Sequence, residues 1–358
     1  MSRFHELRIA DVTRETRDAV SLAFEVPEAL GDAFRFRAGQ HLALRTRIDG
    51  EEVVRTYSIC VGEPTGELRV AVKHQPGGRF SSYANERLAA GQLLEVMEPM
   101  GHFNAVVDPA RPRHHVAFAA GSGITPIISI LETVLAREPH SRFTLVYANR
   151  NTGSMIFRER LEDIKNRHME RFNLISIMSR EQPEIELFHG RIDGAKCDAL
   201  LQHWIDAAQI DECYVCGPEP MTEAVLGSLR QHGVAPARLH HELFTVPGEA
   251  QRRQQARREA TGVDHSATRV TVVVDGRRTR FELPRNSASI LEAGLEAGAD
   301  LPFSCKGGVC ATCRAKLISG EVDMDVNYAL EDYELDAGYV LTCQSFPLSA
   351  EVELSYDD

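Results

Sequence analysis

Four of the eight cysteines lie in the last part of the chain, and their spacing is that of a metal-ligand set. Cys305, Cys310 and Cys313 form a Cys-x4-Cys-x2-Cys run, and 29 residues separate Cys313 from Cys343. Two irons bridged by two sulfides need four thiolates, two on each iron. A tight loop can supply three of these thiolates, and a distant strand can supply the fourth.

This spacing is that of plant-type [2Fe–2S] ferredoxins, and residues 304–313, S-C-K-G-G-V-C-A-T-C, resemble their cluster loop. Gly307 and Gly308 leave backbone N–H groups free to point at the sulfurs. A zinc site is the first alternative, but such sites usually present two close cysteine pairs, and Cys343 stands alone. Free core thiols are the second alternative. We predict a [2Fe–2S] cluster.

The motif Arg55-Thr56-Tyr57-Ser58, in a predicted strand, has the groups that a flavin needs. An arginine can neutralise a flavin diphosphate, a tyrosine can stack near the isoalloxazine ring, and a serine can hydrogen-bond near its N5 atom. Alone, the motif equally fits a solvated arginine and a half-buried ring. A second motif supports the flavin: Val72-Lys73-His74 ends a strand, and residues 77–81, G-G-R-F-S, then open a predicted helix. A helix N-terminus is an anion site.

Two further turns could approach a dinucleotide. Residues 121–126, G-S-G-I-T-P, lie between a predicted buried strand at 116–120 and a helix at 127–136. Residues 216–221, C-G-P-E-P-M, end another strand. Pro126 replaces the third glycine of the common dinucleotide fingerprint, so this turn alone is weak support. Cys213 and Cys216 could instead form a redox pair, but a strand followed by a turn favours the nicotinamide site.

Two short motifs bear on the choice of nicotinamide cofactor. Ser179 and Arg180 follow a predicted strand at 173–178, and an arginine fork suits the 2′-phosphate of NADP. Glu181 is adjacent, and an acid is typical of NAD sites. Asn149 and Arg150 follow the strand at 143–148 and are further candidates, although exposed loop arginines are common. We predict NADPH, with NADH as the alternative.

The pattern of elements predicts a multidomain α/β plus β protein. Residues 1–110 consist of short strands and turns, which is typical of a barrel or sandwich. Residues 111–245 alternate strands with helices, which predicts a parallel, doubly wound sheet. Residues 246–267 are polar and arginine-rich and are predicted to be a linker. Residues 268–358 begin with a hairpin at Asp275-Gly276 and contain the cysteine cluster.

Composition excludes several classes of function. The chain has 52 acidic and 40 basic residues and a net charge of −12, which argues against nucleic acid as a partner. No apolar segment reaches the length of about 20 residues that a membrane span needs, and residues 1–10 lack the apolar core of a secretion signal. We therefore expect a cytoplasmic protein with reduced thiols. Residues 321–336 hold seven acids and no base, a surface that could steer docking to a basic partner or simply be solvated.

Together these motifs resemble the ferredoxin-NADP⁺ reductase superfamily with a C-terminal ferredoxin domain. That resemblance implies an FAD-binding antiparallel β-barrel, a Rossmann-like NADP-binding domain and a β-grasp [2Fe–2S] domain. It implies that hydride transfer takes place beside Tyr57, Ser58, Thr125 and Cys216. It also implies flavin or nicotinamide contacts for Arg55, Tyr57, Ser58, Val72, Lys73, His74, Gly78, Arg79, Phe80, Ser81, Gly121, Ser122, Gly123, Thr125, Pro126, Asn149, Arg150, Ser179, Arg180, Cys216, Gly217, Pro218, Met221 and Phe244. Several relatives carry an E-x-F motif where this chain has Glu242-Leu243-Phe244, with the aromatic ring near the flavin, and Glu242 is the weaker candidate of the two.

Residues 36–40, 189–194, 305–313 and 338–344 resemble most closely the reductase subunits of phenylacetyl-CoA epoxidase complexes. This resemblance implies electron transfer from NADPH, through FAD and the cluster, to the oxygenase subunits of a di-iron monooxygenase in phenylacetate breakdown. One alternative is the reductase of a Rieske-type or other hydroxylase, which uses the same cofactors. Another is a redox-sensing iron–sulfur protein, which would not need the flavin and nicotinamide motifs.

Overall fold

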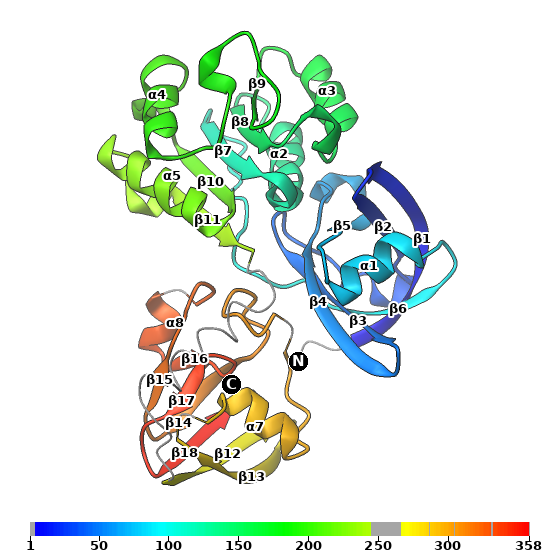
Figure 1. The fold of residues 1–358 in the computed structure, drawn as a ribbon, viewed down its shortest axis with the longest axis vertical. Coiled ribbons are helices and arrows are strands. Elements are labelled where there is room, and N and C mark those ends of the chain that lie inside the picture. The colour runs from blue at the N-terminus through cyan, green and yellow to red at the C-terminus, as the bar shows by residue number, and fades with distance from the viewer. Residues whose placement is uncertain (1–3, 245–265, 286, 304, 331, 358) are drawn as a thin grey trace. The chain divides into compact units, whose positions relative to one another are not determined.

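The computed structural model describes residues 4–244, 266–285, 287–303, 305–330 and 332–357 (Figure 1). These residues form two units, one holding nearly all of residues 4–244 and the other the C-terminal residues from 266 onward. The predicted linker at 246–267 falls almost wholly outside the described residues. None of the helices in the described ranges combines the length and apolar character that a bilayer crossing requires.

The first part of the larger unit is a six-stranded sheet in the order β4-β3-β6-β1-β2-β5. Its strands are β1 (Phe4–Thr16), β2 (Ala19–Glu25), β3 (His41–Ile48), β4 (Glu51–Ser58), β5 (Leu68–Lys73) and β6 (Leu93–Met97), and helix α1 spans Arg79–Glu86. The pairs β1–β2, β1–β6, β2–β5 and β3–β6 are antiparallel. An antiparallel bridge between Ile59 and Val70 joins the two ends of the sheet and closes it into the predicted barrel.

Strand β1 was not among the predicted strands, although it lies in the middle of the sheet. Its sequence is mostly polar, and Leu7 and Ile9 are its fully buried apolar side chains. It is held by pairing on both sides, with Leu7 opposite Leu94 of β6 and Val12 opposite Leu22 of β2. Because two neighbours supply its hydrogen bonds, this strand forms without a strong apolar alternation of its own.

The second part of the larger unit is a five-stranded sheet in the order β11-β10-β7-β8-β9, and every pair is parallel. The strands are β7 (His114–Ala120), β8 (Arg142–Asn149), β9 (Phe172–Met178), β10 (Glu212–Gly217) and β11 (Leu239–Leu243). The helices are α2 (Ile124–Arg137), α3 (Arg158–Arg167), α4 (Gly194–His203) and α5 (Glu219–Gln231). Short 3-10 turns are η1 (Glu28–Leu30), η2 (Glu63–Thr65), η3 (Gly121–Gly123), η4 (Thr152–Ser154), η5 (Glu186–Phe188), η6 (Ala207–Gln209) and η7 (Pro236–Arg238).

Alternate residues of these strands build two apolar layers, one on each face of the sheet. Ala117, Ala119 and Tyr147 pack with α2 and α3, whereas Val116 and Phe118 pack with α4 and α5. Figure 1 shows the two helix pairs on opposite faces. The strand order reverses between β7 and β10, and in sheets of this kind ligands bind outside the carboxyl ends of the strands at such a switch point.

The barrel and the parallel sheet share one apolar core and a row of polar contacts. Cys60 and Phe103 of the barrel side belong to the same buried cluster as α2. Ser129 Oγ donates to the Val61 carbonyl at 2.6 Å, and the Gly62 N–H donates to Glu132 at 2.8 Å. The relative position of the two parts is therefore fixed by packing and by directional hydrogen bonds.

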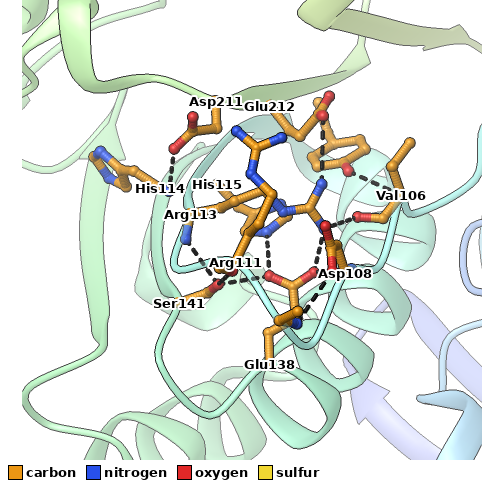
Figure 2. A network of polar contacts seen from close by, with 12 residues as sticks. Val106, Asp108, Arg111, Arg113, His114, His115, Glu138, Ser141, Asp211 and Glu212 are labelled. Atoms are coloured by element: carbon orange, nitrogen blue, oxygen red, sulfur yellow. Dashed lines mark hydrogen bonds and ion pairs between the residues drawn. The ribbon is translucent and has the colours of Figure 1, made fainter.

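The segment that joins the barrel to β7 is anchored by a buried polar network, shown in Figure 2. Glu138, at the end of α2, accepts hydrogen bonds from Arg113, from His115 Nε2 at 2.9 Å and from Ser141 Oγ at 2.6 Å. It also accepts the Asp108 N–H at 2.8 Å. These donors hold the pKa of Glu138 at about 2, below its ordinary value, although burial alone would raise it.

The C-terminal unit is a mixed five-stranded sheet, β13-β12-β18-β14-β16, with a second small sheet, β15-β17. Its strands are β12 (Ala267–Val274), β13 (Arg277–Pro284), β14 (Arg314–Ser319), β15 (Val322–Met324), β16 (Tyr339–Leu341), β17 (Ser345–Pro347) and β18 (Glu351–Ser355), and its helices are α7 (Ile290–Glu296) and α8 (Asp332–Asp336). The hairpin at Asp275-Gly276 forms as predicted, with φ of 53° and 70°. Strands β12 and β18 are parallel, as the predicted β-grasp requires.

One member of the acidic stretch 321–336 does not belong to a solvated surface. The Glu334 side chain is 2% exposed and pairs with Arg314 at 2.5 Å. Glu321, Asp323, Asp325 and Asp336 are exposed. The acidic surface is therefore smaller than the sequence indicates.

Candidate functional site

The switch point of the parallel sheet brings two predicted turns into contact. Gly121–Gly123 follow β7, and Cys216 and Gly217 end the neighbouring strand β10. A Cβ atom on Gly123 would lie 2.1 Å from the Cys216 carbonyl oxygen, so glycine is required at this close approach. The Tyr147 hydroxyl donates to the Gly121 carbonyl at 3.0 Å. The result is a close backbone contact between the two predicted dinucleotide turns.

Cys216 is a neutral thiol in this setting. Its side chain is fully buried, and burial, followed by the nearby charge of Glu242, raises its pKa well above the ordinary value. Cys213 packs into the apolar layer of α4 and α5, whereas Cys216 packs into the layer of α2. Since the two thiols lie on opposite faces of the sheet, they do not form the alternative redox pair. Thr125 is buried nearby, and its hydroxyl donates to the Ser122 carbonyl at 3.0 Å.

The barrel brings side chains to the same place. Ser58, at the end of β4, donates to Glu242 of β11 at 3.3 Å, and Glu242 lies opposite Cys216 in the parallel register of β10 and β11. The Lys73 ammonium lies 3.7 Å from the position that a Cβ of Gly121 would take. The predicted flavin residues Ser58 and Lys73 thus meet the predicted nicotinamide residues. Pro126, Pro218 and Met221 lie in or beside the helices that follow the two turns, and Phe244 packs against the shared core.

The start of α1 fits a flavin diphosphate. Its N-cap, Gly78, provides no side-chain cap, so the amides of the first turn have no side-chain acceptor. Ser81 Oγ accepts the Gln75 N–H at 3.1 Å and donates to the Gly78 carbonyl at 3.2 Å, which holds the loop in shape. The phosphate would therefore be bound chiefly by backbone N–H groups.

The other predicted flavin residues differ in what their side chains can do. Arg79 is paired with Glu51 and with the Ile48 carbonyl, Phe80 is a core ring 5.4 Å from the Tyr57 ring, and Val72 is fully buried. His74 contacts Ser82 Oγ at 3.2 Å, and Arg55 donates to the Val54 carbonyl at 2.7 Å. Tyr57 is half-buried on β4, and its predicted contact with a flavin ring stays a prediction.

Two arginines lie side by side where β8 and β9 end. The Ser179 N–H donates to the Asn149 carbonyl at 3.0 Å, and the Arg180 N–H donates to the Arg150 carbonyl at 2.8 Å. Asn149 is 8% exposed, and its Nδ2 atom has no hydrogen-bond partner among the described residues. Glu181 accepts from the Thr152 N–H at 3.0 Å and from its hydroxyl at 2.6 Å, and these bonds lower the Glu181 pKa. The structure thus brings the backbones of four predicted nicotinamide residues together at these two strand ends, and their contacts with a dinucleotide stay a prediction.

The four predicted cluster ligands form two pairs in the C-terminal unit. Cys305 lies against Cys310, whose Sγ accepts the Cys305 N–H at 3.5 Å, and Cys313 lies against Cys343. No group of three or more metal-binding side chains is gathered around one point in the described parts of the chain. Two pairs correspond to a cluster with two thiolates on each iron.

The loop favours negatively charged sulfur at Cys305, whereas the neighbouring thiols Cys305 and Cys313, followed by burial, raise the pKa of Cys310 and Cys343 well above the ordinary value. The Cys310 thiol and the backbone N–H groups of Gly307 and Val309 lower the pKa of Cys305 to about 6. The Gly307 N–H lies 3.3 Å from Cys305 Sγ, and the Gln344 amide lies 3.7 Å from Cys343 Sγ. Lys306 and Ala311 adopt left-handed backbone with φ of 52°, which is unusual outside glycine. The residues present therefore suit the predicted cluster.

Sequence reasoning gave little weight to Glu242 and none to His41, which lies 3.8 Å from it. Ser58 and Glu242 are 184 positions apart, and only the packing of the barrel on the parallel sheet brings them together. A single histidine in a strand carries no motif. The sequence feature that points to Glu242 is its position two residues before Phe244, in the Glu-Leu-Phe motif.

Comparisons with known proteins agree with this organisation. Family models match residues 6–105 as an oxidoreductase FAD-binding domain, residues 118–226 as an oxidoreductase NAD-binding domain and residues 272–348 as a 2Fe-2S iron-sulfur cluster binding domain. The chain is 46% identical to a subunit of the 1,2-phenylacetyl-CoA epoxidase of Escherichia coli K12, over 100% of this chain and 99% of the relative. It is 33% identical to the ferredoxin reductase component of 3-ketosteroid-9-alpha-monooxygenase from Mycolicibacterium smegmatis, over 99% and 97%.

Solved structures show the same fold. Phthalate dioxygenase reductase, described as a modular structure for electron transfer from pyridine nucleotides to [2Fe-2S], matches with a TM-score of 0.60 and 25% identity over 98% of both chains. An intact type IV self-sufficient cytochrome P450 monooxygenase matches in fold, with a TM-score of 0.67 over 99% of this chain and 41% of that one. The chain belongs to the ferredoxin-NADP⁺ reductase superfamily, in the family of reductases with a C-terminal [2Fe–2S] domain that includes the Escherichia coli relative.

Proposed function

We propose that this protein delivers electrons from NADPH to the oxygenase subunits of a phenylacetyl-CoA epoxidase, a di-iron monooxygenase. The observation that carries this proposal is the 46% identity to one component of such an epoxidase along the whole chain. When bound, FAD accepts two electrons together as hydride and passes them on singly to a [2Fe–2S] cluster. The order of domains in the chain suits that sequence of carriers.

The side chains at the switch point position the reactants. Gly123 lets the turn after β7 pack closely against the Cys216 backbone, so the dinucleotide would approach two turns held together, and Cys216 offers a neutral thiol there. Ser58 points a hydroxyl at the same place from the barrel. Aligning two reactants in a water-poor site is itself a large part of catalysis. Among the predicted hydride-transfer residues, Tyr57, Ser58, Thr125 and Cys216, none is needed as a general acid or base.

The arginine pair supports NADPH over NADH. The backbones of Arg150 and Arg180 are hydrogen-bonded at neighbouring strand ends and both residues are exposed, so their guanidinium groups are available to a 2′-phosphate, an anion that arginine binds well. Glu181 is the acid that could favour NADH, but both of its oxygens are engaged by Thr152. We infer that its carboxylate is turned toward Thr152 and leaves the arginines available.

The first experiment adds NADPH or NADH anaerobically to the purified protein and follows the visible spectrum. We expect both the flavin and the cluster bands to bleach quickly, and at lower concentrations of NADPH than of NADH. Flavin that does not respond to either nucleotide would instead support a redox sensor. Equal responses to both would reject the NADPH preference alone.

The second experiment tests the partner. The protein is combined with purified epoxidase subunits, NADPH and phenylacetyl-CoA, and product formation is compared with the subunits alone. We expect product only when the reductase is present. If NADPH bleaches the cofactors but no product forms, the acceptor is another oxygenase, such as a Rieske-type hydroxylase. The match to the ferredoxin reductase component of a 3-ketosteroid-9-alpha-monooxygenase makes electron delivery to another monooxygenase the second candidate.

A further inference from the structure

His41 of the barrel and Glu242 of the parallel sheet face each other beside the switch point. His41 opens β3, and its Nδ1 atom lies 3.8 Å from Glu242 Oε1. The two side chains are only 5% and 12% exposed. Both side chains are shielded from water, and a buried carboxylate needs polar partners. The contact is therefore a candidate for a specific role.

The backbone around His41 fixes the place of its ring. The His41 N–H donates to the Met100 carbonyl at 2.9 Å, and the Met100 N–H donates to the His41 carbonyl at 3.0 Å. The residue after Met100, Gly101, has a φ of 113°, and a Cβ there would lie 2.8 Å from His41 Nδ1. Glycine at this position leaves the space that the imidazole fills. The ring is thus built into the barrel.

The two oxygens of Glu242 face different partners. Oε1 faces His41, and Oε2 accepts the hydrogen bond from Ser58 Oγ at 3.3 Å. The Ile59 N–H donates to the Gln40 carbonyl at 2.8 Å, and this bond brings Ser58 beside the start of β3. Glu242 also lies opposite Cys216 in the register of β10 and β11. The carboxylate stands between the hydroxyl on the flavin side and the thiol on the nicotinamide side.

Of the two imidazole nitrogens, Nδ1 is the one with a partner. His41 Nε2 is buried and makes no hydrogen bond among the described residues. His41 can therefore stabilise one orientation of the Glu242 carboxylate without competing for another acceptor. With Oε1 held in this way, Oε2 stays directed at the Ser58 hydroxyl.

We propose that His41 is a positioning residue: it holds the Glu242 carboxylate against Ser58, so that the serine hydroxyl keeps one orientation where nicotinamide meets flavin. This inference rests on the proposed function. In this proposal His41 acts through Glu242. It also ties the barrel to the parallel sheet at the point where hydride passes.

The test compares two substitutions of His41. His41→Leu keeps the volume but removes both nitrogens, whereas His41→Asn can place an amide N–H near the position of Nδ1. Flavin reduction by NADPH is followed anaerobically in a stopped-flow instrument. We expect His41→Leu to slow reduction at saturating NADPH by about tenfold, with little change in the NADPH concentration needed for half the maximal rate. His41→Asn is expected to recover most of the rate.

A matched control lies on the same strand as Glu242. His240 of β11 pairs with Glu212 at 2.8 Å, remote from Ser58, so His240→Leu makes the same chemical change away from the site. We expect it to reduce at the wild-type rate. A double variant adds Glu242→Gln to His41→Leu. If His41 acts through Glu242, the double variant is no slower than Glu242→Gln alone.

A second readout does not depend on activity. Nitrogen-15 spectra of histidine-labelled, oxidised protein report the ring nitrogens of His41 directly. We expect Glu242→Gln to move the His41 Nδ1 resonance and Glu212→Gln to leave it in place. An unmoved resonance contradicts the pairing.

The outcomes separate the two proposals. Wild-type protein whose flavin is not reduced by NADPH refutes the proposed function. A wild-type rate in His41→Leu, with an equal FAD content, refutes only the role of His41. Equal losses in His41→Leu, His41→Asn and His240→Leu indicate general destabilisation and also overturn it.

Discussion

At the scale of single residues, one threonine holds the acid that lies next to the proposed phosphate-binding arginines. Thr152 engages both oxygens of Glu181 through its hydroxyl and its N–H. Arg180 follows Ser179 at the end of β9 and lies beside Arg150. Without the hydroxyl bond, the carboxylate could swing to the arginines and compete with the 2′-phosphate. The proposed selectivity for NADPH would therefore depend on a residue that need not touch the cofactor.

Thr152→Val is expected to weaken NADPH use. The substitution keeps the shape but removes the 2.6 Å hydroxyl bond to Glu181, so a loss of roughly 3- to 10-fold in kcat/KM for NADPH is expected, the range for one hydrogen bond to a charged group. The value for NADH should change little. Adding Glu181→Gln should restore NADPH use, because the competing charge is gone. No recovery in the double variant would reject this explanation.

Arg180→Gln tests the phosphate contact itself. Removing one guanidinium should raise KM for NADPH by about 10-fold or more, while KM for NADH and the maximal rate stay close to wild type. Steady-state kinetics with an artificial electron acceptor give both constants. Arg167→Gln is the control, because Arg167 is exposed in the last turn of α3, where its Nε donates to the Asp163 carbonyl. An equal rise in KM for NADH would mean that Arg180 does not bind the 2′-phosphate.

Residues whose chemistry dictates their spacing could be predicted from the sequence. The cysteine pattern and the glycine next to Cys216 are of this kind, because a cluster and a dinucleotide both impose local geometry. His41, Glu242 and Thr152 were given little or no weight, because their roles arise from contacts between segments far apart in sequence or from a single hydrogen bond. The ion pair between Arg79 and Glu51 could not be predicted either, because the two residues are 28 positions apart and their contact leaves no local sequence pattern.

At the scale of elements, the end of α2 holds the connection between barrel and sheet. Glu138 collects the buried donors drawn in Figure 2, from the connecting segment, β7 and the start of β8. Arg113 supplies the matching charge, and its side chain is 6% exposed. Breaking such a buried pair leaves an uncompensated charge, which is usually strongly destabilising.

Glu138→Gln is therefore expected to lower the free energy of unfolding by about 3 kcal/mol at pH 7. Urea unfolding followed by the fluorescence of Trp204, the single tryptophan, measures this free energy, because Trp204 lies in the same parallel-sheet part of the chain as Glu138. Glu162→Gln, which removes an exposed pair with Arg158, should change stability by less than about 0.5 kcal/mol. Similar losses in both variants would contradict the role assigned to Glu138.

The same carboxylate gives the stability a defined pH dependence. Its pKa is about 2 in the folded protein against 4.5 ordinarily, so its contribution is fully present above pH 4.5 and is lost as the pH falls toward 2. The difference between wild type and Glu138→Gln should therefore be constant from pH 7 to pH 5 and shrink below pH 4.5. A difference that grew on acidification would reverse the sign and reject the assignment.

Helices and strands with long apolar runs could be predicted from the sequence, whereas strands made mostly of polar residues could not. The buried strands β7, β8 and β9 and helix α2 lie within a few residues of their predicted bounds, because their burial on both faces leaves continuous apolar runs. Strands β1 and β11 are polar and were not predicted. β11 carries His240, His241 and Glu242, and the hydrogen bonds of β10 rather than its own apolar pattern make it a strand.

At the scale of the whole molecule, charge is unevenly distributed along the chain. Residues 266–358 hold 16 acidic and 8 basic residues, a balance of −8 within the total of −12. Glu321, Asp323, Asp325 and Asp336 keep this charge at the surface, while Glu334 is neutralised by Arg314. A one-sign surface speeds encounters with a partner of opposite sign, most strongly at low salt.

The triple variant Glu321→Gln, Asp323→Asn, Asp336→Asn should therefore slow electron delivery to the oxygenase. We expect the rate of electron delivery to fall by about 3- to 10-fold at low ionic strength. The difference from wild type should shrink as salt is added, because at 0.1 M salt charges are screened beyond about 10 Å and the wild-type attraction is itself weak. Flavin reduction by NADPH should be unchanged. The control neutralises three exposed acids of the other unit, Glu28, Glu86 and Glu170, and so changes net charge equally. Because steering depends on where the charge lies, the control variant should deliver electrons at the wild-type rate. If both triple variants were slowed equally, the change in net charge, and not the acidic surface, would explain the loss.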